Sequence, residues 1–297
     1  MNRSPVVIFS LLFLLLCWGY SWVFLKMGLD DSGPFTFAAL RTLVAAIFLL
    51  CMLPLSKRPF LPLRLRETLA LGLVQTALFV GLSQWSLVSG GVGKTAILVF
   101  TMPFWVLVFS AFILQERIVG KQWVAVILAA IGLILVLTPW HFMGSLQSQY
   151  LALAAGMAWG LSTVMAKRIQ HAAPIDVLNL TAWQMLFGSF LLGSVALIVG
   201  ERPVAWTPQF IGVLSFTGLV ATGLGWLVWL FLLQHLSANV AAMSILAVPV
   251  IAIIAAAIHY GERPAFVEMI GIALIIGSLW ILALIQRSPK EVIIEPP

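Results

Sequence analysis

The feature that most constrains this chain is a series of ten apolar runs, each about 20 residues long. A helix of that length spans the roughly 30 Å hydrocarbon core of a bilayer. The connections between the runs are too short to hold a soluble domain. The sequence therefore predicts an all-α integral membrane protein with ten transmembrane helices. The predicted spans are Val6–Met27, Pro34–Leu53, Glu67–Leu87, Val92–Leu114, Gln122–Thr138, Tyr150–Ile169, Ile175–Val199, Gln209–Leu233, Asn239–His259 and Ala265–Gln286.

Composition agrees with a membrane location and excludes several other classes. Hydrophobic residues make up 62% of the chain and charged residues only 9%, whereas soluble domains carry roughly 25% charged residues. The net charge of +6 is therefore no indication of nucleic-acid binding. Cys17 and Cys51 both lie in apolar runs, so neither a disulfide framework nor a metal site is expected. No cofactor is expected either.

Two of the runs contain a proline near their middle, Pro103 and Pro249. Proline has no N–H, so the carbonyls of Val99 and Ile245 should each lose their usual partner in the helix. In a membrane such a break persists only where protein or a water-filled cavity satisfies the freed group. We therefore expect these two broken helices to meet at the centre of the protein and to act as its gates.

The same pattern of residues occurs twice along the chain. Pro103 and Pro249 lie 146 residues apart, as do the two Glu-Arg pairs that begin at Glu116 and Glu262. The pairs Trp18-Gly19 and Trp159-Gly160 repeat with a shift of 141 residues. Each repeat holds five spans, and because five is odd the second repeat must be inverted relative to the first. We place the first repeat at residues 1–140 and the second at residues 141–297.

The Trp-Gly pairs, the Pro-to-Glu spacing and their order along the chain resemble the drug/metabolite transporter superfamily. The most similar branch is the ten-helix carriers with two EamA domains, which include bacterial exporters of aromatic and neutral amino acids. The resemblance extends from about Val6 to Gln286. It implies a carrier of the cytoplasmic membrane whose cavity is lined by the first, third, fourth, sixth, eighth and ninth helices.

Candidate cavity residues follow from the breaks and the repeated tryptophans. Trp18 and Trp159 lie in the middle of their spans, whereas membrane tryptophans usually gather at the interfaces. Packing between helices and lining of a cavity are both open for them. The full set of cavity candidates is Trp18, Phe79, Ser83, Phe100, Met102, Trp159, Trp229, Met243 and Ser244, with Trp226 one helical turn from Trp229. Aromatic surface with a few polar groups suits a small amphipathic solute.

Two cations are further candidates, Arg41 and Lys94. Arg41 lies inside a span, and the expectation is that it snorkels to the outer surface near Asp30 or Asp31; binding of a carboxylate is the alternative. Lys94 follows a glycine-rich turn that lacks the spacing of a phosphate-binding loop. It either belongs to a tight turn or attracts an anionic group at the outer mouth.

The acidic residues all lie in loops or at the ends of spans. Small multidrug carriers of the same superfamily use a carboxylate buried in their first helix, and the corresponding stretch here reads Leu15-Leu16-Cys17-Trp18. This difference argues against exchange of protons for cationic drugs.

The distribution of Lys and Arg predicts the orientation. With the N-terminus inside, eleven of these residues lie in inner segments and four in outer segments. Inner segments carry the excess of Lys and Arg in membrane proteins. Both termini are therefore expected in the cytoplasm.

The function predicted from the sequence is an inner-membrane secondary transporter that exports small organic metabolites by alternating access. Amino acids are the favoured solutes, and nucleobases, sugars or phosphorylated metabolites are the alternative. An intramembrane enzyme is not expected, because no nucleophile, base or metal-ligand cluster is visible at one depth. The expected partners are a small-molecule substrate and the lipid bilayer, without nucleic acid, and the simplest assembly is a monomer.

Overall fold

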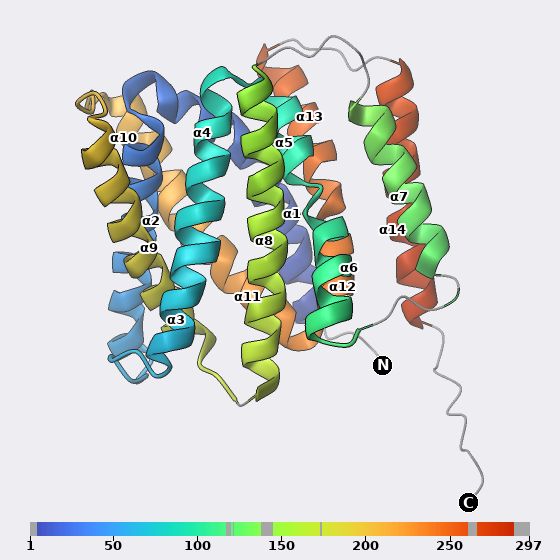
Figure 1. The fold of residues 1–297 in the computed structure, drawn as a ribbon, viewed down its shortest axis with the longest axis horizontal. Helices are drawn as coiled ribbons and strands as arrows, with labels where there is room; N and C mark the ends of the chain where they lie inside the picture. The colour runs from blue at the N-terminus through green and yellow to red at the C-terminus, as the bar shows by residue number, and fades with distance from the viewer. Residues whose placement is uncertain are drawn as a thin grey trace, which may run out of the picture.

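The computed structural model describes residues 5–116, 120, 122–137, 145–172, 174–260 and 266–287, and all regular elements in these ranges are helices. They form a bundle whose chain passes back and forth between two ends (Figure 1). The first repeat contains α1 Pro5–Asp31, α2 Pro34–Leu55, α3 Leu65–Leu71, η1 Gly72–Val80, α4 Gly81–Ser89, α5 Val92–Val99, α6 Met102–Ile113 and α7 Gln122–Leu137. The second contains α8 Leu146–Ala172, α9 Val177–Val199, α10 Pro208–Ser215, η2 Phe216–Leu224, α11 Gly225–His235, α12 Ala238–Ser244, η3 Ile245–Ala247, α13 Val248–Tyr260 and α14 Phe266–Arg287.

These elements correspond to the ten predicted spans, so the predicted fold class is confirmed. Four spans are built from consecutive helical pieces, namely α3–η1–α4, α5–α6, α10–η2–α11 and α12–η3–α13. In the part of the chain that the structure describes, six continuous helical segments are long and apolar enough to cross a membrane, judged by length and composition alone. Helix α1 begins and α14 ends at the same end of the bundle, the lower end in Figure 1.

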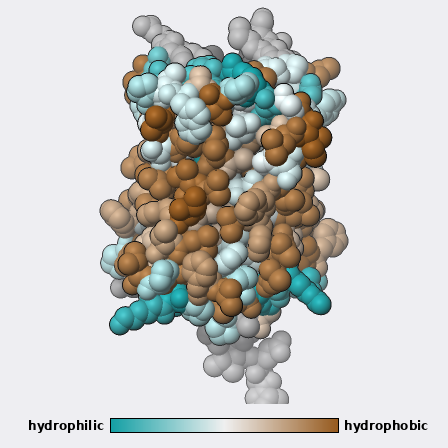
Figure 2. Space-filling model, turned by 90° about the vertical axis from the view of Figure 1, so that its left-hand side faces the viewer, coloured by the Kyte–Doolittle hydropathy of each residue, from teal (hydrophilic) through white to brown (hydrophobic). Residues whose placement is uncertain are grey.

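The surface shows where the bilayer lies. On the face drawn in Figure 2, a broad apolar band crosses the middle of the molecule, with polar residues concentrated toward both ends. Large apolar side chains are exposed within the helices, among them Phe9 on α1, Phe112 on α6 and Leu197 on α9. A contiguous exposed apolar surface of this extent marks contact with a membrane.

The two repeats interlock rather than standing side by side. Equivalent helices pair with each other, α2 with α9 and α7 with α14, the latter pair standing at the right of Figure 1. Helix α1 packs against α13 of the second repeat, and α8 packs against α5 and α6 of the first. The broken span of each repeat is therefore covered by the first helix of the other.

The predicted interruptions occur where the prolines require them. Helix α5 ends at Val99, and Pro103 lies in the first turn of α6, where a missing N–H costs little. In the ninth span, a 3-10 turn over Ile245–Ala247 separates α12 from α13, of which Pro249 is the second residue. Both breaks are thus confirmed as structural features.

Glycines allow the covering helices to approach these breaks closely. A Cβ atom added to Gly160 would lie 2.7 Å from the Cβ of Trp105, and one added to Gly156 would lie 2.8 Å from the Val99 carbonyl oxygen. Gly19, the repeat equivalent of Gly160, is as crowded, with the Cβ of Ile251 at 2.5 Å. The small residues beside the two tryptophans therefore serve helix packing in both repeats.

The sequence does not predict the two π-helical segments, η1 and η2. They occupy the middle of the third and eighth spans, which are equivalent positions of the two repeats. π-helical turns are rare and are frequent at functional sites. Here both segments flank the same cavity, described next.

Candidate functional site

Four tryptophans from both repeats meet at the centre of the bundle. Ring centroids of Trp18 lie 5.3 Å from Trp159, 5.1 Å from Trp226 and 6.0 Å from Trp229. All four side chains are buried. These separations fall in the range of favourable aromatic pairs, about 4.5–7 Å. Helices α1, α8 and α11 are therefore joined through one aromatic cluster.

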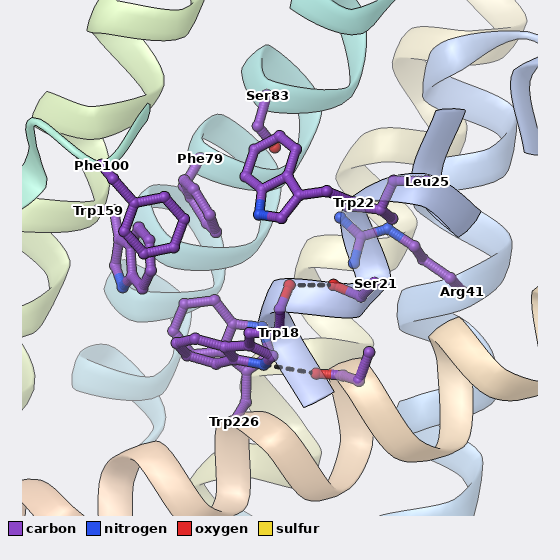
Figure 3. A pocket seen from close by; sticks show the side chains of 11 residues that line it. Trp18, Ser21, Trp22, Leu25, Arg41, Phe79, Ser83, Phe100, Trp159 and Trp226 are labelled. Atoms are coloured by element: carbon purple, nitrogen blue, oxygen red, sulfur yellow. Dashed lines mark hydrogen bonds between the residues drawn. The ribbon is translucent and has the colours of Figure 1, made fainter. Parts of the chain in front are cut away.

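The position of Trp18 is fixed by the eighth span. Its indole N–H donates a 2.9 Å hydrogen bond to the carbonyl oxygen of Ala221 on η2, shown as a dashed line in Figure 3. A Cβ atom at Gly225 would lie only 2.4 Å from the Trp18 Nε1 atom. Glycine at position 225 is thus what lets the indole reach α11.

A cavity of about 50 Å³ lies beside the cluster (Figure 3). Its lining residues are Trp18, Ser21, Trp22, Leu25, Arg41, Phe79, Ser83, Phe100, Trp159, Ala221 and Trp226. A buried water molecule needs at least about 10–15 Å³ of cavity volume, so this cavity has room for about three to five waters. In this conformation the cavity is contracted, and a solute of amino-acid size enters only if the aromatic side chains move apart.

Arg41 lines this cavity, which corrects the expectation that it snorkels to the surface. The side chain is only 6% exposed, and its Nη1 donates a 2.9 Å hydrogen bond to the Thr222 hydroxyl on η2. Arg41 lies on the same helix face as Ala38 and Ala45, which are fully buried. The side chain leaves α2 toward the bundle, because these small neighbours make space there, and neither Asp30 nor Asp31 is its partner.

The structure brings together most, but not all, of the predicted cavity residues. The cavity is lined by Arg41 together with the predicted residues Trp18, Phe79, Ser83, Phe100 and Trp159. Trp229 is not a lining residue, but its ring contacts those of Trp18 and Trp159.

Three others lie elsewhere. Met102 is fully buried at the start of α6, Met243 packs in a separate cluster with Ile97 and Ala129, and the Ser244 hydroxyl donates to the Val240 carbonyl of its own helix. The Lys94 side chain, like Glu262 and Arg263, lies outside the described residues.

Four lining residues were not among the cavity candidates predicted from the sequence, namely Ser21, Trp22, Leu25 and Ala221. Trp22 follows Trp18 by four residues, which places both on one face of a helix, so the spacing could have revealed it. Ala221 contributes through its carbonyl oxygen, and no side-chain pattern indicates such a role.

Two lysines secure the two ends of the bundle. Lys26 Nζ on α1 donates to the carbonyl oxygens of Leu87 and Gly90, at 2.6 and 3.4 Å, where α4 ends. Lys167 Nζ on α8 donates to those of Leu233 and Leu236, at 2.5 and 2.7 Å, where α11 ends. Cations are favoured at helix C-termini, where carbonyls lack partners. Helices α4 and α11 end at opposite ends of the bundle in Figure 1, so each end has one lysine clamp.

A carboxylate reinforces the lower clamp. The two Glu116 side-chain oxygens accept from the backbone N–H groups of Ala238 and Asn239, each at 3.4 Å, at the start of α12. Ser110 on α6 also donates to the Asn239 side chain at 2.7 Å. At this end the fourth span therefore binds the ninth next to the Lys167 clamp.

An inverted-repeat helical bundle with a cavity at the interface of the repeats is a recurring architecture of membrane carriers. The chain belongs to the EamA-like transporter family, whose sequence pattern matches residues 6–138 and 147–284. It is a transporter of the drug/metabolite transporter superfamily, as the resemblance predicted.

Individual relatives agree with this assignment. The chain is 31% identical to the uncharacterized transporter YvbV of Bacillus subtilis, covering 94% of this chain and 92% of the relative. It is 28% identical to a probable amino-acid metabolite efflux pump of Salmonella typhimurium, over 92% and 93% of the two chains. A solved crystal structure superposes with a TM-score of 0.79 over 96% of this chain and 99% of the other, at 15% identity. That likeness shows the shared fold.

Proposed function

We propose that this protein is an inner-membrane secondary transporter that exports small organic metabolites, with amino acids as the favoured class, by alternating access. The observation that carries the proposal is the central cavity. Its walls come from the first, second, third, fourth, sixth and eighth spans, and thus from both inverted repeats. Substrate sites of such transporters lie at the repeat interface near the bilayer midplane. In this proposal the repeats comprise residues 1–140 and 141–297.

The two lysine clamps support alternating access. A carrier exposes its site to one side at a time, so it needs a closure at each end. Lys26 and Lys167 provide the same chemistry at the two ends, each joining the first helix of a repeat to the third. Opening at one end requires that its own clamp and the contacts beside it release, while the other clamp stays formed.

The favoured solute class has two supports. The cavity wall is largely aromatic with a few polar groups, which suits amino acids with apolar side chains. A relative in Salmonella typhimurium carries the name probable amino-acid metabolite efflux pump. Carriage of nucleobases, sugars or phosphorylated metabolites is the competing class, and the same assay separates them.

Counterflow into proteoliposomes, against a panel of labelled amino acids, bases, sugars and sugar phosphates, tests the proposal. We expect accumulation of amino acids with apolar side chains. Trp159→Ala should abolish it, whereas Trp280→Ala, at a position 67% exposed on α14, should not. Failure of every solute to exchange, or equal rates in empty liposomes, would contradict the proposal.

The proposed orientation puts both termini in the cytoplasm and Asp31 outside, because eleven Lys and Arg residues lie in the segments on one side and four on the other. The test uses a chain in which Cys17 and Cys51 are replaced and Asp31 is replaced by cysteine. Labelling of position 31 by an impermeant reagent should occur in intact cells. Labelling only after the cells are opened would reverse the orientation.

Energy coupling is proposed not to require a proton gradient. The buried polar and charged side chains in the described part of the chain include no aspartate or glutamate. A carboxylate in the bundle is the usual proton carrier in such transporters. Flux of solute down its own gradient in vesicles without a pH difference is therefore expected, and an absolute need for a proton gradient would refute this.

A further inference from the structure

We propose that Arg41 is the anchor for a carboxylate on the transported solute, so that the cavity selects monocarboxylates with an apolar or aromatic body. This inference rests on the proposed transport function, because the anchor is placed in the transport cavity. It goes further by naming the group that the solute must carry and the residue that binds it.

The first argument is the isolation of the Arg41 charge. A buried cation is costly unless an opposite charge compensates it. Within the described chain, ion pairs join Arg58 to Asp176 and Arg64 to Glu67, and neither involves Arg41. Its hydrogen-bond partner is the neutral Thr222. Ionisable residues retained inside a membrane bundle generally mark the path of a substrate or ion, and an anionic solute would supply the missing counter-charge.

The second argument is the type of the unpaired groups. Among the residues that line the cavity, Arg41 Nε and Trp159 Nε1 are the buried side-chain atoms without a hydrogen-bond partner in the described chain. Both are donors. A ligand that complements them must bring acceptors, and a carboxylate brings two oxygens with about four acceptor sites.

The third argument is the geometry of the guanidinium. Thr222 occupies Nη1, which leaves the Nε edge of the group unpartnered. Two parallel N–H donors on such an edge bind both oxygens of a carboxylate at once. In Figure 3 the Arg41 head group extends from α2 toward Trp22 and Ser21, which also line the cavity.

The remaining wall determines what else the solute contains. Trp18, Trp159, Trp226, Phe79 and Phe100 form the apolar side of the cavity. Arg41 is the one charged residue among the described lining residues. A single cation balances a single negative charge, so a carboxylate fits better than a phosphate dianion. An α-ammonium group meets aromatic faces and the hydroxyls of Ser21 and Ser83, which tolerate a cation but do not require one.

The test compares four ligands that share a phenyl ring on a two-carbon chain and differ in the polar groups attached to it: 3-phenylpropionate, phenylalanine, 3-phenylpropionamide and 2-phenylethylamine. Binding to the purified wild-type protein is measured from the ligand-dependent rise in thermal unfolding temperature. We expect both carboxylates to bind, and the amide and the amine to bind at least tenfold more weakly. Equal binding of acid and amide would overturn the proposal, as would tighter binding of phenyl phosphate than of 3-phenylpropionate.

Variants identify the residue. Arg41→Gln should weaken 3-phenylpropionate at least tenfold while leaving the amide unchanged, and Arg41→Lys should restore part of the loss. Arg168→Gln, next to Lys167 on α8 but exposed, is the matched control and should have no effect. Unchanged carboxylate binding in Arg41→Gln would overturn the assignment. If Arg41→Gln does not fold, Arg41→Lys and Thr222→Val replace it in the binding measurement. The comparison of the four ligands on the wild-type protein does not depend on any variant.

The same measurements separate this inference from the proposed function. Counterflow that does not discriminate acids from amides would refute the anchor and leave the transporter intact. Selective carboxylate binding without any counterflow would support the anchor and refute transport.

Discussion

Lys26 and Lys167 make the same contact at opposite ends of the molecule. Each ammonium group reaches from the first helix of its repeat to the last carbonyls of the third helical span, Leu87 and Gly90 in one case and Leu233 and Leu236 in the other. The carbonyl pairs are separated by 146 residues, the shift that relates the two prolines. The inverted repeat therefore reproduces a specific hydrogen-bonding arrangement as well as the fold.

Replacing one lysine should favour opening at that end. Lys26→Met and Lys167→Met each remove hydrogen bonds from a charged donor, which contribute about 1.5–3 kcal/mol. That corresponds to a change of roughly ten- to a hundredfold in the ratio of open to closed states. The reporter is a cysteine at position 83, in a chain without Cys17 and Cys51. Its labelling should rise from the α4 end in Lys26→Met and from the α11 end in Lys167→Met.

The control for this experiment is Arg168→Met. It removes an exposed cation from the same turn of α8 as Lys167 and should leave labelling from both ends unchanged. Equal labelling in all three variants, or an increase at the wrong end, would show that the lysines do not control access.

Alanine at the crowded glycines should destabilise the fold. An added Cβ at Gly160 would be 2.7 Å from Trp105, and at Gly19 it would be 2.5 Å from Ile251. Overpacking of this kind costs about 1–3 kcal/mol, so both variants should unfold at lower temperature. Gly212→Ala on α10, where nothing lies within 4 Å, is the control and should be neutral or slightly more stable. A similar unfolding temperature for all three would contradict the packing role.

Pro103→Ala and Pro249→Ala should slow transport more than they disturb folding. Both prolines lie in the first turn of a helix, where their ring is tolerated, so restoring the N–H alters the fold little. The new N–H can extend a regular helix across the break. A continuous helix no longer packs differently in the two conformations that alternating access requires. We expect both proteins to purify normally, with counterflow about tenfold slower, a change of ~1.4 kcal/mol in barrier. Wild-type counterflow and unchanged labelling at position 83 would make the prolines packing features only.

The contact between Trp18 and Trp159 should appear as a coupling energy. Their rings meet edge to face with centroids 5.3 Å apart, and such pairs contribute about 0.5–1.5 kcal/mol beyond burial. Unfolding free energies of Trp18→Leu, Trp159→Leu and the double variant provide the measurement. The sum of the single losses should exceed the loss in the double variant by that amount. Strict additivity would mean that the two indoles do not stabilise each other in this conformation.

Hydropathy and the repeat predicted the spans well because both depend on properties of long segments. A run of 20 apolar residues has few alternatives in a membrane, and the 146-residue shift located both helix breaks. Applied to single residues, the same shift also identifies equivalent positions in the two repeats. Met243 is the repeat equivalent of Ile97. Both side chains pack in the cluster that includes residues of α7 and α14, away from the cavity.

The parts that could not be predicted depend on helix rotation and backbone geometry. The sequence places Arg41 inside a span without stating which way it faces, although the buried Ala38 and Ala45 one turn on either side mark the inner face. The π-helical segments η1 and η2 have no recognisable composition, and the acceptor that holds Trp18 is a backbone carbonyl on one of them. Such groups become visible only when neighbouring helices are in place.

The four clustered tryptophans also have an optical consequence. Indoles whose ring centroids lie 5.1–6.2 Å apart share their excited states, and this coupling falls steeply as the rings separate. The cluster joins α1 and α8, the first helices of the two repeats, to α11, so a movement that widens the cavity must also part the rings. The circular dichroism of the indole bands then reports the conformational cycle of the native protein, with no label attached.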